Sequence, residues 1–399
     1  VWKTLANAQT LLGVGGGRTL CGTLNPKAVT SNELYGYVHP VTKELNDGII
    51  AKLMRDFSKM ASAVPKWVVL DGDIDAEWIE SMNTVMDDNK VLTLVSNERI
   101  PLTASMRLLL EISHMRNASP ATASRGGVLY LNESDVGWRP YVQTWVDESE
   151  LVAADQGGAG SMKLLLEQLF EQFVPETLDW LRKNKCLHVT PLMDFAMVET
   201  LCSLFGGIVS CVALPKEENE KDALRLTIEA CYQQAAVWAF GGALTADKAT
   251  DHRKQFSDWW RSEWSKSPVK FPDEGLVFDY TFDGERRKMA HWRERIPSYS
   301  HIRELPISSV VVPTMDTTRL SFLIELLMLC QKPLMLVGAA GTAKSTIFRD
   351  RLRSLPDEFV SFTINFNSYT SAATLQFMLE QPLEKKTGVS RAYDPSRTA

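Results

Sequence analysis

Residues 338–346 read Gly-Ala-Ala-Gly-Thr-Ala-Lys-Ser-Thr, a run of small side chains that leads into a lysine and a serine. The apolar residues 333–337 precede this run and a helical pattern follows it, which predicts a buried strand, a loop and the start of a helix. In that arrangement, backbone N–H groups and the positive end of the helix surround a phosphate chain. Lys344 would contact the outer phosphates and Ser345 would ligate Mg²⁺. The sequence therefore predicts a phosphate loop for ATP or ADP.

The predicted loop departs from the pattern G-x-x-x-x-G-K-[ST] at Ala343, where the pattern has glycine. The methyl group would narrow the cradle or strain the turn, and so weaken binding. The alternative is an ordinary strand-turn-helix that carries Lys-Ser by chance, which the flanking strand and helix patterns disfavour. The predicted nucleotide-binding residues of the loop are Gly338, Ala339, Ala340, Gly341, Thr342, Ala343, Lys344, Ser345 and Thr346.

A second candidate site ends the apolar run 67–71, whose last residue is Asp71. This is the form of a strand that positions magnesium beside a phosphate loop in a parallel sheet. Hydrolases normally carry a second acidic residue next to it, which polarises the attacking water, and here that position is Gly72. We therefore predict a site that holds Mg-nucleotide without hydrolysing it. The alternative is that Asp73 or Asp75 supplies the base from the next turn, with a different reach.

An internal echo suggests two copies of one module. The spacing of Asn25, Thr30 and Ser31 recurs within residues 365–371, and each set follows a predicted helix. The first helix begins at Val1, so the echo predicts that the phosphate loop of the first copy precedes this residue. The alternative is that the three positions match by chance. The run at 67–71 favours a repeated module, because a strand that ends in a carboxylate is typical of a module that carries a phosphate loop.

Composition sets broad limits on the class of protein. The chain has 399 residues, of which 45% are hydrophobic and 23% are charged, enough for two or three globular domains. A net charge of −6 and a pI near 5.7 do not indicate binding to nucleic acid or to an anionic membrane. The longest uncharged stretch, 200–215, is shorter than the ~20 residues of a membrane-spanning helix. The six cysteines include no C-x-x-C pair and are expected to be reduced core thiols of a cytosolic protein.

Patterning predicts an α/β fold, with parallel sheets flanked by helices, plus a mostly helical lid. Apolar runs at 106–112 and 128–131 are predicted strands, and Arg125 lies between them in a loop followed by two glycines, well placed to project outward. A lone arginine in such a loop is more commonly only solvated. From about residue 161 the pattern changes to helical stripes, with a hairpin near 276–284. The predicted domains are 1–155, 156–303 and 304–399.

Taken together, these stretches resemble the motor ring of dynein heavy chains, particularly the axonemal ones. The similar segments are residues 24–30, 67–100, 117–127, 238–242, 277–280 and 312–319 together with the phosphate loop. The resemblance covers nearly the whole chain. It implies most of a second AAA+ module followed by the first half of a third, within a ring of six modules that drives motion toward microtubule minus ends.

The resemblance also implies roles for single residues. Asp71 matches the magnesium-side carboxylate of the second module. Arg125 matches the arginine finger that this module offers to the first module's site, where its guanidinium would stabilise charge on the transferred phosphoryl group. Lys344 and Ser345 match the phosphate-loop residues of a regulatory third module.

The remaining expectations also come from the resemblance. Pro313 and Thr314 would border the adenine. The implied partners are the neighbouring AAA+ modules, microtubules, and dynein intermediate and light chains, in the cytoplasm and cytoskeleton of the ciliary or flagellar axoneme. The full heavy chain would be an ATPase motor, whereas these 399 residues alone would hydrolyse little ATP. Two alternatives are a non-motor AAA+ remodelling ATPase of the ribosome-assembly type and a structural module with nucleotide as scaffold.

Overall fold

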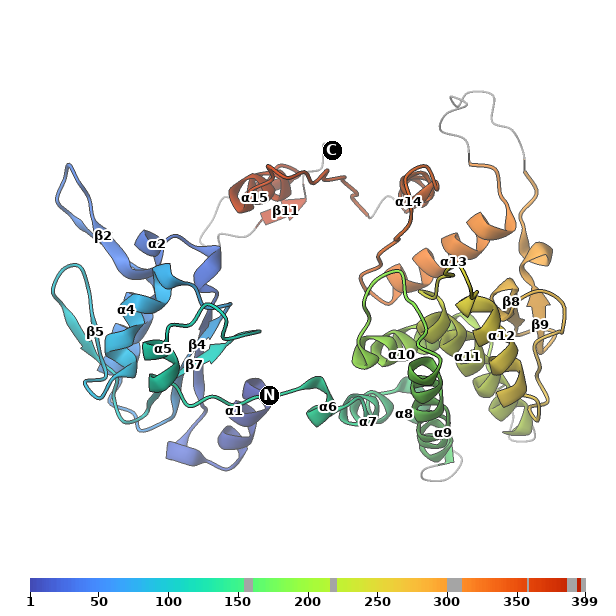
Figure 1. Cartoon of the computed structure of the whole chain (residues 1–399), viewed down its shortest axis with the longest axis horizontal. Coiled ribbons are helices and arrows are strands. Elements are labelled where there is room, and N and C mark those ends of the chain that lie inside the picture. Colours follow the sequence, from blue (N-terminus) through green and yellow to red (C-terminus); the bar gives the residue numbers. More distant parts are fainter. Residues whose placement is uncertain (154–160, 216–220, 300–310, 357–358, 386–392, 396–399) are drawn as a thin grey trace. The chain divides into compact units, whose positions relative to one another are not determined.

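The computed structural model describes residues 1–153, 161–215, 221–299, 311–356, 359–385 and 393–395. Contacts between residues divide the chain into two compact units, both visible in Figure 1. The first unit comprises Val1–Tyr130 with Asn365–Gln381, and the second comprises Leu131–Ile364 with Pro382–Ala399. The phosphate loop therefore belongs to the second unit, and Asp71 and Arg125 belong to the first.

The first unit contains a parallel sheet whose strands are ordered β1 (Leu20–Leu24), β4 (Lys66–Asp71) and β7 (Met106–Glu111). The central strand, β4, hydrogen bonds along both edges, and its residues up to Leu70 are buried. Such burial on both faces is what a continuous apolar run predicts for a parallel strand. The strands predicted at 67–71 and 106–112 are therefore confirmed.

Helices cover this sheet with stripes of apolar side chains. The main ones are α1 (Trp2–Leu11), α3 (Ile49–Lys59) and α4 (Ala76–Met86). In α4 the buried residues recur every three or four positions, as helical periodicity requires: they are Trp78, Ile79, Met82 and Val85. The shorter elements of this unit are η1 (Val14–Gly16), η2 (Pro26–Ala28), α2 (Ser31–Tyr35), β2 (Gly36–Val38), β3 (Leu45–Asp47), β5 (Val91–Thr93), β6 (Arg99–Pro101), α5 (Pro120–Arg125) and α15 (Ala372–Glu380).

The second unit is mostly helical. Its helices are α6 (Glu133–Val136), α7 (Arg139–Asp147), α8 (Glu150–Ala153), α9 (Ser161–Lys183), α10 (Asp194–Cys211), α11 (Lys221–Gly241), α12 (His252–Glu263), α13 (Met315–Leu329) and α14 (Lys344–Arg353). The predicted hairpin is confirmed by the antiparallel strands β8 (Tyr280–Asp283) and β9 (Lys288–His291). The remaining short elements are η4 (Val277–Asp279), η5 (Trp292–Arg295), β10 (Leu383–Lys385) and β11 (Tyr393–Pro395).

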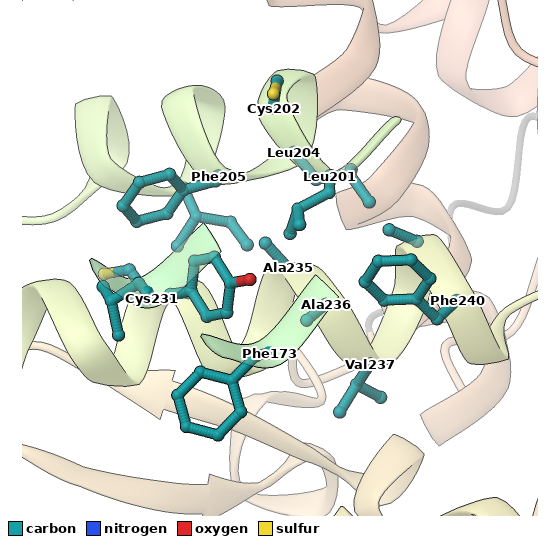
Figure 2. Packing of buried hydrophobic residues seen from close by; sticks show 14 of the residues in the cluster. Phe173, Leu201, Cys202, Leu204, Phe205, Cys231, Ala235, Ala236, Val237 and Phe240 are labelled. Carbon is teal, nitrogen blue, oxygen red and sulfur yellow. The ribbon is translucent and has the colours of Figure 1, made fainter. Parts of the chain in front are cut away.

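Aromatic side chains form the centre of the core in this helical unit. Figure 2 shows Phe173 and Phe205 directed into the space between the helices, together with small residues of α11 such as Ala235. Phe173 stacks on Trp264 with ring centroids 4.1 Å apart, and Trp260 is fully buried beside Phe256, with centroids 5.6 Å apart. Large rings fill the core, so the helical stripes read from the sequence correspond to buried faces.

Two predicted strands are wrong. Residues 128–131 and 333–337 pair with no strand in the part of the chain that the structure describes. The apolar side chains of 128–131 are exposed, with Leu129 at 88%. In residues 333–337 exposure alternates: Met335 is 72% exposed, whereas Leu334 and Leu336 are half-buried and Leu334 packs against the core of the helical unit. A parallel strand is stable only when neighbouring strands accept its backbone hydrogen bonds, and periodicity does not reveal whether such neighbours exist.

The cysteine prediction is confirmed only in part. All six cysteines are free thiols, but only Cys202 and Cys231 are buried, whereas Cys21 and Cys211 are exposed. Burial raises the pKa of the Cys231 thiol to about 12, so it stays protonated and inert. Among the described residues, one helix, α10, is long and apolar enough to cross a membrane by length and composition alone. Its mean hydropathy is 1.4, and half of its residues are buried inside the second unit.

We expect Trp260→Ala to destabilise the helical unit by roughly 3–5 kcal/mol, because it removes a fully buried indole and leaves a cavity. Chemical denaturation followed by circular dichroism would measure this change in the free energy of unfolding. Leu164→Ala, at an exposed site on α9, is the control and should change it by less than about 0.5 kcal/mol. Equal effects of the two substitutions would contradict the described core.

Candidate functional site

Asp71 lies at the carboxyl end of β4, the edge where parallel α/β sheets bind their ligands. Its side chain is exposed, and its register partner on β7 is Glu111. The indole Nε1 of Trp2 donates a hydrogen bond to Glu111 Oε2 at 2.6 Å, which fixes the amino end of α1 beside this edge. The sheet thus presents two carboxylates next to each other, and Asp71 is the one that ends the fully buried strand.

The two carboxylates considered as alternative bases are both used by local structure. Asp73 accepts hydrogen bonds from the backbone N and the Oγ of Ser113, at 2.8 and 2.7 Å, and these bonds hold the pKa of Asp73 below its usual value. Asp75 caps α4 by accepting from the backbone N of Glu77 at 2.9 Å and of Trp78 at 3.4 Å. Such bonds hold each carboxylate toward a backbone N–H group, which fits a site that lacks a base.

The phosphate loop wraps around the ammonium group of Lys344. This group donates three hydrogen bonds, which are to Gly338 O at 2.9 Å, Ala339 O at 2.5 Å and Thr342 Oγ1 at 3.0 Å. Helix α14 begins at Lys344, so the N–H groups of its first turn and the ammonium lie at one place. A phosphate could replace the carbonyl oxygens as the partner of the lysine and also accept from these N–H groups.

Ala343 adopts a left-handed backbone conformation, with φ 61° and ψ 12°. A residue with a Cβ atom pays roughly 1–2 kcal/mol there, whereas glycine does not. Position 341 also has a positive φ, 79°, and the residue there is glycine, which adopts this conformation without strain. The phosphate-loop pattern therefore asks for glycine at position 343 because of the backbone, and the predicted strain at Ala343 has a conformational origin.

Helix α14 is fastened to α13 through Arg351, which forms an ion pair with Glu325. Ile347 is buried, one turn after the loop. Thr314 caps α13: it accepts from Thr317 N at 3.2 Å, and its own N–H donates to Thr317 Oγ1 at 2.7 Å. The predicted adenine-bordering residues, Pro313 and Thr314, thus lie at the start of α13, one helix before the phosphate loop.

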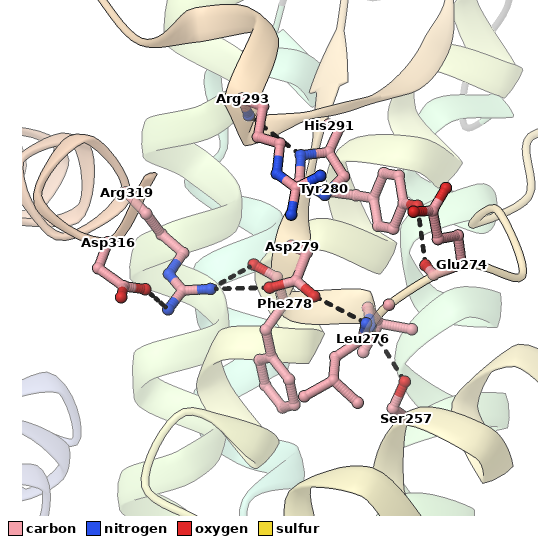
Figure 3. A network of polar contacts seen from close by, with 12 residues as sticks. Ser257, Glu274, Leu276, Phe278, Asp279, Tyr280, His291, Arg293, Asp316 and Arg319 are labelled. Atoms are coloured by element: carbon pink, nitrogen blue, oxygen red, sulfur yellow. Dashed lines mark hydrogen bonds and ion pairs between the residues drawn. The ribbon is translucent and has the colours of Figure 1, made fainter. Parts of the chain in front are cut away.

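Arg319 is a residue that the sequence analysis did not single out, and it anchors the start of α13. Figure 3 shows its guanidinium between Asp316 and Asp279. It donates to Asp316 Oδ1 at 2.6 Å, to Asp279 Oδ1 at 3.2 Å and to Phe278 O at 3.1 Å. It also lies over the ring of Trp238, 5.4 Å from the centroid. The one signal in the sequence was the spacing of Asp316 and Arg319, which are neighbours on a helix.

Arg125 is the last residue of α5, a helix that Ser119 caps by accepting from Thr122 N at 3.2 Å. Its Nε donates to Asp87 Oδ1 at 2.5 Å, and its Nη1 donates to Ala121 O at 3.1 Å. The side chain is 30% exposed, so it lies on the surface of the first unit. Asp87 is its one carboxylate partner among the described residues, and a guanidinium on the surface can exchange such a partner for another anion.

The fold and the phosphate loop define a P-loop nucleotide-binding protein with an appended helical lid. Two family models match: "Dynein heavy chain AAA lid domain" over residues 166–294 and "P-loop containing dynein motor region" over residues 299–398. The chain belongs to the dynein heavy-chain family. The predicted resemblance and the α/β fold class with a helical lid are thereby confirmed.

Three relatives illustrate the degree of similarity. The chain is 47% identical to the dynein beta chain of the flagellar outer arm of Chlamydomonas reinhardtii over its whole length. It is 46% identical to the ciliary dynein beta chain of Heliocidaris crassispina over 94% of the chain, and 44% identical to human dynein axonemal heavy chain 9 over 93%. In each case the chain spans about 8% of the length of the relative.

Replacing Ala343 should change the stability of the second unit in a direction set by the backbone. We expect Ala343→Gly to relieve about 1 kcal/mol of strain and so to raise the free energy of unfolding, and Ala343→Val to lower it. Chemical denaturation would measure both changes. Ala249→Gly, at an exposed loop residue of the same unit whose φ is not positive, is the matched control and should not gain stability. Equal changes for Ala343→Gly and Ala249→Gly would contradict the prediction.

Proposed function

We propose that this chain is part of an axonemal dynein motor, an ATPase that moves along microtubules in the cytoskeleton of cilia and flagella. The observation that carries the proposal is the full-length similarity to flagellar and ciliary dynein heavy chains, combined with a phosphate loop built around Lys344. Because the chain spans about 8% of these relatives, motor activity belongs to the whole heavy chain, and these residues alone hydrolyse little ATP. The family models favour this function over a ribosome-assembly remodelling ATPase.

We propose three domains within the chain. Residues 1–155 form the large part of a second AAA+ module, 156–303 form its helical lid, and 304–399 form the first half of a third module. The matched families fit this order, because the lid domain covers 166–294 and the P-loop region covers 299–398. The network around Arg319 is consistent with a junction at which the lid is fixed to α13 of the following module.

In this proposal the second module binds ATP with Mg²⁺ and does not hydrolyse it. Asp71 lies on the magnesium side, and Gly72 leaves the neighbouring position without a base.

The third module would use its own phosphate loop as a regulatory site. Lys344 would contact the outer phosphates of ATP or ADP. The Ser345 hydroxyl, at the first turn of α14, fits Mg²⁺, a cation that prefers oxygen ligands. Thr346 follows on the same turn. Pro313 and Thr314 would border the adenine, held in place by the capped start of α13.

Arg125 would act on the neighbouring first module. An exposed guanidinium at the end of α5 has the planar charge that stabilises a transferring phosphoryl group, and its single carboxylate partner is Asp87 in the described part of the chain. The further partners proposed are the other AAA+ modules of the same chain, microtubules, and dynein intermediate and light chains.

Arg125→Ala in the full-length heavy chain should lower ATP hydrolysis by at least about 10³-fold, because the transition-state charge at the first module loses its guanidinium. Steady-state ATPase measurements with microtubules would show the loss. Arg116→Ala, at an exposed arginine that precedes α5, is the control and should retain activity. Turnover by the Arg125 variant at the level of the Arg116 variant would rule out the finger, and would favour a module in which nucleotide is only a scaffold.

A further inference from the structure

The guanidinium of Arg125 is held at two of its nitrogens and open at the third. Its Nε donates to Asp87 Oδ1 at 2.5 Å, and its Nη1 donates to Ala121 O at 3.1 Å. Within the described residues, no group accepts a hydrogen bond from Nη2. The five N–H donors of a guanidinium lie in one plane, so two fixed donors set the direction of the others. An oxygen of a phosphoryl group can therefore accept from Nη2 while Asp87 stays in place.

Asp87 is fixed at the carboxyl end of helix α4. Its backbone N donates to Asn83 O at 3.0 Å, and its backbone O accepts from Lys90 N at 3.0 Å. This end of a helix carries a partial negative charge, so a carboxylate there is unfavourable unless a cation lies beside it. Asp88 follows with a second carboxylate. Arg125 supplies such a cation, and in the described part of the chain it pairs with Asp87 and not with Asp88.

Helix α5 is fastened to the same end of α4. The Thr122 side chain is buried, and its Oγ1 donates to Asn83 Oδ1 at 3.3 Å. Arg125 lies three residues further along α5, and Asn83 also accepts the backbone bond from Asp87. An ion pair on a surface contributes little when two long side chains must both be ordered. Here the backbones of both partners are already fixed and the carboxylate is on a short side chain, so the pair mainly orders the arginine.

We propose that Asp87 is a positioning residue, which sets the orientation of the Arg125 guanidinium before it meets the nucleotide of the neighbouring module. This inference rests on the proposed function, in which Arg125 stabilises the transferred phosphoryl group at the first module. A guanidinium that is already oriented does not have to be ordered during the reaction, and this lowers the barrier. In this assignment Asp87 touches neither the nucleotide nor the reacting atoms, and it acts only through Arg125.

Steady-state ATP hydrolysis by the full-length heavy chain with microtubules tests the inference. We expect Asp87→Ala to lower kcat about fivefold and to leave KM for ATP unchanged, because the lost orientation matters only in the transition state. Asp87→Asn keeps an acceptor for Nε and should lower kcat less than Asp87→Ala does. Asp88→Ala is the matched control, since it removes the neighbouring exposed carboxylate, which has no partner among the described residues, and it should retain the full kcat.

Hydrogen exchange in the same heavy chain separates positioning from a structural role. In Asp87→Ala the amides of α4 and α5 should exchange within about twofold of the unsubstituted rate, because the bond between Thr122 and Asn83 still holds the two helices together. Thr122→Val removes that bond and should speed exchange severalfold. If Asp87→Ala speeds exchange as much as Thr122→Val does, Asp87 acts on the fold and the inference is overturned.

The kinetics also separate the inference from the function on which it rests. A large loss of turnover in Arg125→Ala together with a fivefold loss of kcat in Asp87→Ala supports both. A large loss in Arg125→Ala with equal kcat for Asp87→Ala and Asp88→Ala keeps the arginine finger and overturns the role of Asp87. A higher kcat in Asp87→Ala would overturn it too, because Asp87 would then withhold the arginine. Full turnover by Arg125→Ala overturns both the function and the inference.

Discussion

The hydrogen bonding of parallel strands is the constraint on which the proposed sites depend. A strand inside a parallel sheet satisfies its backbone by hydrogen bonding to a strand along each edge, whereas a strand at the border of the sheet has one such partner. β4 meets this condition with β1 and β7, and so its last residue, Asp71, is held at the carboxyl edge of the sheet next to Asn25 and Gly72. The two apolar segments that lack such partners in the described residues, 128–131 and 333–337, form no strand, and the first of them is exposed.

The same constraint explains what the sequence could and could not predict. Helices were predictable because their stripes are local, and α4 buries the very residues that its periodicity selects. A strand depends on partners that are distant in sequence, so an apolar run predicted β4 correctly and residues 333–337 wrongly. The departure at Ala343 was visible as a broken pattern, whereas its cause, a left-handed backbone, required coordinates.

The helical lid and the phosphate loop are connected through one helix, α13. Its first turn is fixed to the lid by Arg319, whose guanidinium joins Asp316 to Asp279. Further along, the ion pair between Glu325 and Arg351 holds α14, the helix that begins at the loop lysine. Arg319 and Asp279 have low exposure, 12% and 18%, so this pair is costly to separate and fixes α13 to the lid. Asp316 and Glu325 are largely exposed, and their ion pairs contribute less. The order of family matches along the sequence, lid and then P-loop region, agrees with that connection.

We propose that the chain carries parts of two nucleotide sites with different chemistry, one that retains ATP beside Asp71 and one built on the loop around Lys344. A high-resolution structure of the full-length heavy chain, frozen after incubation with ATP and Mg²⁺ for many turnovers, would distinguish them. We expect intact ATP with its metal on the Asp71 side of the second module, and phosphates within hydrogen-bond distance of Lys344 in the third. ADP beside Asp71, or a nucleotide that avoids the loop around Lys344, would contradict it.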